Sequence, residues 1–168
     1  MIRDPERRGR ELAKLYATLA PRLFEDLAAA ELLDSAAPAR ARAWREWECF
    51  ALYACVRGLV AAGGFNRETA AAIDALHEAA LDAWVADARG GETLDERRRL
   101  ISDRYAEYGA IGQAGGASGA ATVAERLGLA AARHMSGVDD PPAVLSEAVG
   151  TLHEELVLGA TTSVNQAA

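Results

Sequence analysis

Five polar or charged side chains occur on predicted helix faces that are otherwise apolar: Arg57, His77, Arg98, Tyr105 and Tyr108. An isolated charge in apolar surroundings is costly, so a buried guanidinium must pair with a carboxylate or bind a ligand. These residues are therefore the candidates for a small-molecule pocket, whose ligand could be an anion. The alternative is an internal ion pair, with Glu48 or Asp87 as the partner of Arg57, and tyrosine hydroxyls that reach solvent.

The spacing of potential metal ligands is not that of a metal site. A di-iron or di-manganese bundle needs paired Glu-x-x-His motifs on different helices. Asp74 and His77 form one related pair, and a metal site would have to combine them with His153 and Glu154. We therefore expect neither a metal nor a cofactor.

The residue pattern also gives no catalytic constellation. Cys49 and Cys55 lie six positions apart on one predicted helix and point to different faces, so we expect two reduced thiols. No nucleophile elbow and no Ser/His/Asp signature occurs. The sequence predicts no catalytic residue and favours a protein that is not an enzyme.

A glycine-rich stretch from residue 112 to residue 119 precedes a predicted helix start, where backbone amides could hold an anion. A phosphate-binding loop, however, follows a strand and carries a lysine, and this stretch follows a helix and has none. The pattern favours a mobile connection over an anion site.

The second predicted helix suggests a protein interface. From Cys49 to Ala62 its only charged residue is Arg57, and Trp44 and Trp47 come just before this run. A helix that is apolar all round is buried on all sides, in its own bundle or against a partner. The prediction is a homodimer in which this helix and the two tryptophans bury surface against the second copy.

Hydrophobic periodicity and capping signals predict six helices, with Pro21 as a kink or a break within the first. Gly63, Gly64 and Asn66 separate the second helix from the third, Thr93 and Glu96 form a capping box, and Asp140 and Pro141 open the last helix. The predicted helices span about 5–33, 39–62, 67–88, 94 to 108 or 111, 120–135 and 141–158.

Composition excludes several function classes. The chain has 168 residues, of which 51% are hydrophobic and 26% are charged, and its net charge of −7 opposes binding to nucleic acid. The apolar run of the second helix is shorter than a membrane span, and no secretory signal follows the amino-terminal arginines. We expect a cytoplasmic protein, and the preference for arginine over lysine suggests a bacterial genome rich in GC.

The sequence therefore predicts an all-α, single-domain helical bundle of five to six helices with an apolar central helix. The bundle is expected over 1–158, and residues 159–168 are expected to form a frayed tail. The expected function is a helical interaction module that self-associates as a homodimer. The alternative is a bundle that binds a small molecule, possibly an anion, or has a regulatory role.

Overall fold

The computed structural model describes residues 4–87, 91–115 and 120–166. Within these ranges the chain forms six α-helices and no strand, which confirms the all-α prediction. The helices are α1 (Pro5–Ala29), α2 (Ala37–Gly63), α3 (Arg67–Ala86), α4 (Leu94–Gly115), α5 (Ala120–Ser136) and α6 (Ala143–Gln166).

Local side-chain chemistry sets the starts of three of the six helices, α1, α3 and α4. Asp4 accepts hydrogen bonds from the amides of Glu6 and Arg7 at the start of α1, and Asn66 accepts one from the Thr69 amide at the start of α3. At the start of α4, Thr93 and Glu96 exchange hydrogen bonds between side chain and backbone. These contacts satisfy amides that have no partner inside the helix. The predicted capping box is confirmed.

Two helices run further than the sequence indicated. α4 continues through Gly109 and Gly112 to Gly115, where a mobile connection was expected, and residues 116–119 lie outside the described part. α6 continues to Gln166, so the expectation of a frayed tail from residue 159 is wrong for 159–166. The reason is packing, since Ala160 and Val164 are buried on α6. Residues 167 and 168 are not described.

Pro21 does not divide the first helix. α1 is one continuous helix from Pro5 to Ala29, and Pro21 lies on its exposed side. The sequence left open a kink or two abutting helices, and two separate helices are excluded. The helix ends before the predicted boundary at residue 33.

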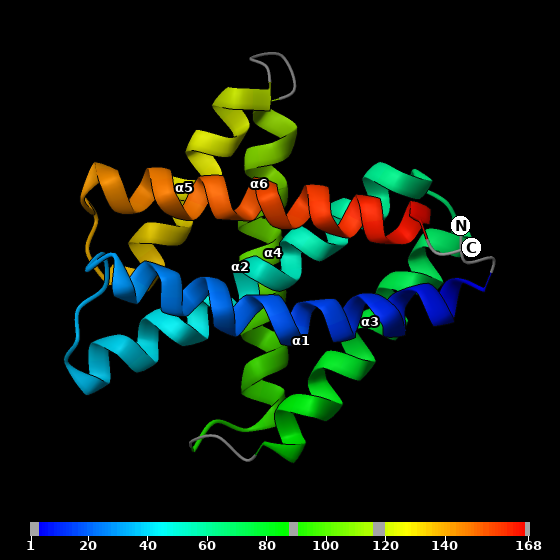
Figure 1. Ribbon diagram of the computed structural model, residues 1–168, viewed down its shortest axis with the longest axis horizontal. Coiled ribbons are helices and arrows are strands. Elements are labelled where there is room, and N and C mark those ends of the chain that lie inside the picture. Colours follow the sequence, from blue (N-terminus) through cyan, green and yellow to red (C-terminus); the bar gives the residue numbers. More distant parts are fainter. Residues whose placement is uncertain (1–3, 88–90, 116–119, 167–168) are drawn as a thin grey trace.

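α2 lies at the centre of the bundle. It packs against α6 and α5 and also contacts α1, α3 and α4, while α1 packs along α3 (Figure 1). The side chains of Trp47, Phe50, Ala51 and Ala54 have no exposed surface. The expected apolar central helix is therefore present, and helices of the same chain cover it.

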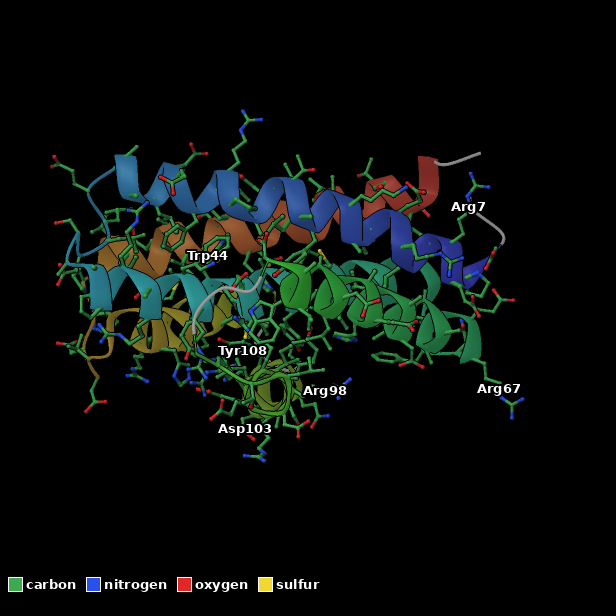
Figure 2. The ribbon with its side chains drawn as sticks, turned by 90° about the horizontal axis from the view of Figure 1, so that it is seen from below. Arg7, Trp44, Arg67, Arg98, Asp103 and Tyr108 are labelled. Atoms are coloured by element: carbon green, nitrogen blue, oxygen red, sulfur yellow. The ribbon has the colours of Figure 1, made fainter. Side chains whose placement is uncertain are left out.

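α4 is the outermost helix. Figure 2 looks down its axis and shows it below the other helices, which it crosses in Figure 1. Only four of its residues are buried, namely Arg97, Leu100, Tyr108 and Gly115. Ion pairs join it to α2 at Arg97 with Glu48 and at Arg104 with Glu46. Polar contacts thus contribute much of what holds α4 in place.

Among the described helices, none combines the length and the hydropathy that a bilayer-spanning segment requires.

Candidate functional site

The residues predicted from the sequence to form a pocket come together only in part. The His77 Nε2 atom lies 2.8 Å from the Tyr105 hydroxyl, and the Tyr53 ring lies 5.1 Å from the ring of Tyr105 and 5.4 Å from that of Tyr108. Burial lowers the pKa of His77 and raises that of Tyr105. These rings form a packed cluster, and none of them lines the pocket described below.

The two predicted arginines have separate positions. Arg57 forms an ion pair with Glu154 of α6, and both side chains are partly exposed. The partner of Arg57 in the structure is therefore Glu154, whereas the sequence suggested Glu48 or Asp87. Arg98 is on the exposed side of α4, 3.9 Å from Asp95.

His153 is a buried imidazole at the end of this cluster. It is 1% exposed and stacks on Phe50, with the ring centroids 3.9 Å apart. Burial, followed by the positive charge of Arg57, lowers the pKa of His153 well below its ordinary value. The sequence carried a signal for this position, since His153 follows Val149 by four residues on the inward face of α6.

The buried imidazole predicts a loss of stability in acid. Above pH 6.5, the ordinary pKa of histidine, residue 153 is neutral in both the folded and the unfolded chain. Below it, the unfolded chain takes up a proton that the folded chain does not, so the free energy of unfolding falls by up to about 1.4 kcal/mol per pH unit from this group. Urea denaturation between pH 7 and pH 5 should show a shallower fall for His153→Leu. An equal fall in both proteins would contradict the assignment.

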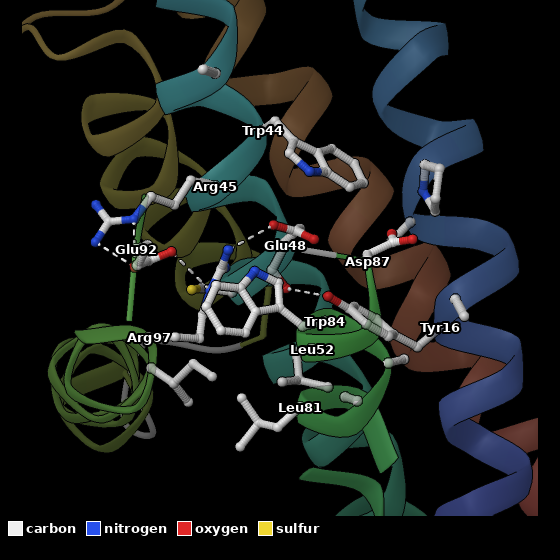
Figure 3. A pocket seen from close by; sticks show the side chains of 18 residues that line it. Tyr16, Trp44, Arg45, Glu48, Leu52, Leu81, Trp84, Asp87, Glu92 and Arg97 are labelled. Carbon is white, nitrogen blue, oxygen red and sulfur yellow. Dashed lines mark hydrogen bonds and ion pairs between the residues drawn. The ribbon is translucent and has the colours of Figure 1, made fainter. Parts of the chain in front are cut away.

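A pocket of about 460 Å³ lies on another side of α2, between α1, α3 and the start of α4 (Figure 3). Each helix contributes residues spaced three or four apart, which share one helix face. On α2 this stripe is Ala41, Trp44, Arg45, Glu48, Cys49 and Leu52. The other lining residues are Tyr16, Ala17, Ala20, Pro21, Ala80, Leu81, Ala83, Trp84, Asp87, Glu92, Arg97 and Ile101.

Ion pairs form one side of the pocket. Arg97 Nη2 lies 3.1 Å from Glu48 Oε2, and Arg97 Nε lies 3.2 Å from Glu92 Oε2. Arg45 Nη2 lies 2.8 Å from Glu92 Oε1. The hydrogen bond to Glu92 raises the pKa of Arg45. Each guanidinium therefore has a carboxylate partner inside the pocket.

Aromatic side chains form much of the remaining wall. Trp44 and Trp84 are both partly buried, and the guanidinium carbon of Arg97 lies 4.9 Å from the ring centroid of Trp84. The Tyr16 hydroxyl donates to the Glu48 carbonyl oxygen at 3.3 Å. Burial raises the pKa of the Cys49 thiol to about 12, so this thiol is protonated and a poor nucleophile at neutral pH.

The two tryptophans expected at an interface have different roles. Trp44 lines the pocket, whereas Trp47 has no exposed surface and donates its indole hydrogen to the Ala20 carbonyl oxygen at 2.8 Å. Trp47 therefore offers no surface to a partner in this fold. None of the five predicted ligand residues lines the pocket.

Sequence reasoning missed the pocket for an identifiable reason. Its ion pairs join the charged half of α2 to α4, and a charged stripe is also typical of a solvated helix face. The spacing of Trp44, Glu48 and Leu52 was the available signal, since it places an indole and a carboxylate beside an apolar side chain.

No group of three or more histidine, cysteine or acidic side chains within the described ranges is placed to hold a metal ion. Comparison of the chain with known protein families, with curated proteins and with solved structures gave no match.

Proposed function

We propose that this chain is a helical bundle that binds a small molecule in the pocket between α1, α2, α3 and α4. The observation that carries the proposal is the pocket itself, because its volume of about 460 Å³ is in the range of small-molecule sites. Largely apolar walls with a few fixed polar groups are also typical of such sites.

The pocket walls are held in place before any ligand enters. Phe24 packs against Trp44 with the ring centroids 5.0 Å apart, and Arg97 lies over Trp84. Glu48 and Glu92 in turn hold Arg97. Binding to a preformed site loses less conformational entropy than binding to a site that must first become ordered. This favours a binding function for the pocket.

The interaction module and homodimer stay predictions. They were expected because the apolar circumference of α2 needed a cover, and α1, α3, α5 and α6 of the same chain provide much of it. The cytoplasmic location and the bacterial origin also stay predictions. The pocket is the feature that a ligand-binding role would use, so that role is preferred here.

A pocket-filling substitution tests the proposal. Ala17 is exposed on α1 and lines the pocket, so Ala17→Trp should occupy part of the cavity without disturbing the core. The neutral dye N-phenylnaphthylamine should bind the natural chain with a fluorescence increase that saturates at one dye per chain. Its affinity for Ala17→Trp should be lower by about tenfold or more.

The matched control is Thr18→Trp, which adds the same side chain at an exposed neighbour outside the pocket lining. It should bind the dye like the natural chain. Thermal melts of both variants check that the fold is retained. Absence of saturable dye binding, or equal binding by both variants, would contradict the proposal.

A further inference from the structure

We infer that the pocket selects an uncharged ligand with a flat aromatic ring, which stacks on the indoles of Trp44 and Trp84. This inference rests on the proposed small-molecule function and specifies the chemical class of its ligand. Three features of the pocket carry it: the pairing of its charges, the arrangement of its rings and the state of its indole N–H groups.

The two guanidiniums of the pocket pair with two of its carboxylates, Glu48 and Glu92. The side chain of Arg97 is 8% exposed and lies between Glu48, at 17%, and Glu92, at 15%. An anionic ligand would compete with Glu48 and Glu92 for the Arg97 guanidinium and would meet their negative charges in the same pocket. A cationic ligand would meet the guanidiniums of Arg45 and Arg97, which already occupy Glu48 and Glu92. The net charge of −7 further opposes the approach of an anion.

The rings of the pocket suit a planar partner. Trp44, from α2, and Trp84, from α3, both line the cavity, and Tyr16 adds a third ring from α1. Figure 3 shows Trp44 and Trp84 between the network of Arg45, Glu92 and Arg97 on one side and Tyr16 with Asp87 on the other. Aromatic rings prefer offset-stacked or edge-to-face contacts with other rings, which a saturated ring cannot reproduce.

The indole N–H groups of Trp44 and Trp84 can orient a ligand by donating hydrogen bonds to it. Trp47 donates its indole hydrogen to the Ala20 carbonyl, but within the ranges that the structure covers neither Trp44 nor Trp84 donates a hydrogen bond. Both rings are partly buried and line the pocket. A ligand with a hydroxyl, ether or carbonyl oxygen at its edge can accept from them without carrying a charge.

Four matched probes test the inference by isothermal titration calorimetry on the full chain: naphthylmethanol, naphthoate, the naphthylmethylammonium ion and decahydronaphthylmethanol, all substituted at the same ring position. Naphthylmethanol should bind most tightly. The anion, the cation and the saturated alcohol should each bind more weakly by about fivefold or more. Equal or tighter binding of any of these three overturns the inference and leaves the proposed function standing. If none of the four probes binds, the proposed function itself is contradicted.

A pair of variants locates the binding. Trp84→Leu should lower the affinity for naphthylmethanol by about fivefold or more. It should also reduce the ratio of the affinity for naphthylmethanol to the affinity for the saturated alcohol. Phe65→Leu is the matched control, since Phe65 is 94% exposed and lies outside the pocket lining. It should leave the affinities for naphthylmethanol and for the saturated alcohol unchanged. If Trp84→Leu keeps the full preference for the aromatic alcohol, stacking on Trp84 is excluded and the inference fails.

Discussion

Replacement of Gly9 by alanine should lower the free energy of unfolding by about 3 kcal/mol, because it forces two helix backbones apart. A Cβ atom at residue 9 would lie 2.1 Å from the Ala72 carbonyl oxygen and 2.8 Å from the Leu76 amide nitrogen. Both are backbone atoms of α3, so no side-chain rotation relieves the overlap. Urea denaturation with a constant m-value measures the change.

Gly109 provides the matched control. It lies inside α4, and a Cβ atom there would meet no atom within 4 Å. Gly109→Ala should therefore raise the free energy of unfolding by about 0.5 to 1 kcal/mol, since alanine loses less backbone entropy in a helix than glycine does. If Gly9→Ala is as stable as the natural chain, α1 and α3 do not cross at Gly9 as described.

Replacement of Arg104 by alanine should lower the free energy of unfolding by about 3 to 5 kcal/mol. Arg104 holds Glu46 with two hydrogen bonds, Nε to Oε2 at 2.7 Å and Nη2 to Oε1 at 2.9 Å. The Glu46 side chain is only 5% exposed. Its carboxylate would stay buried without a counter-charge, and α4 would lose one of the ion pairs that tie it to α2.

The double variant Glu46→Leu with Arg104→Leu separates this effect from packing. Removal of both charges leaves no uncompensated carboxylate, so the double variant should be much more stable than Arg104→Ala. Hydrogen exchange should show that Arg104→Ala loses protection in α4 before α2, because α4 is the outermost helix with few buried side chains. If Arg104→Ala lowers the free energy of unfolding by less than about 1 kcal/mol, the Glu46 carboxylate becomes solvated in that variant and the prediction is wrong.

The sequence by itself determined the fold class and the approximate positions of the helices, although α1 ends earlier and α4 and α6 end later than predicted. Apolar residues at three-to-four-residue spacing form helices wherever local caps allow them to begin, and Asn66, Thr93 and Glu96 cap the helices that they were predicted to cap. These are local interactions between residues a few positions apart, so a linear pattern contains them. The apolar centre of α2 was visible for the same reason.

Helix spacing places a residue on a face, but it does not say which helix that face meets. Trp44 and Trp47 are three positions apart, yet one lines the pocket and the other is enclosed by the core. The sequence predicted a carboxylate partner for Arg57, and in the structure this partner is Glu154 on α6, 97 positions further along the chain. The sequence does not show which carboxylate lies next to Arg57, because that depends on how distant helices pack together.

Only the tertiary structure decided the pocket and the close helix crossings. The pocket exists because stripes from α1, α2, α3 and α4 converge on Trp44, Trp84 and the Arg97 network. Gly9 allows α1 to approach α3 so closely because it has no side chain, a role that its sequence context does not reveal. Each of these features depends on the distance and angle between helices, and those follow from how all the buried side chains pack together.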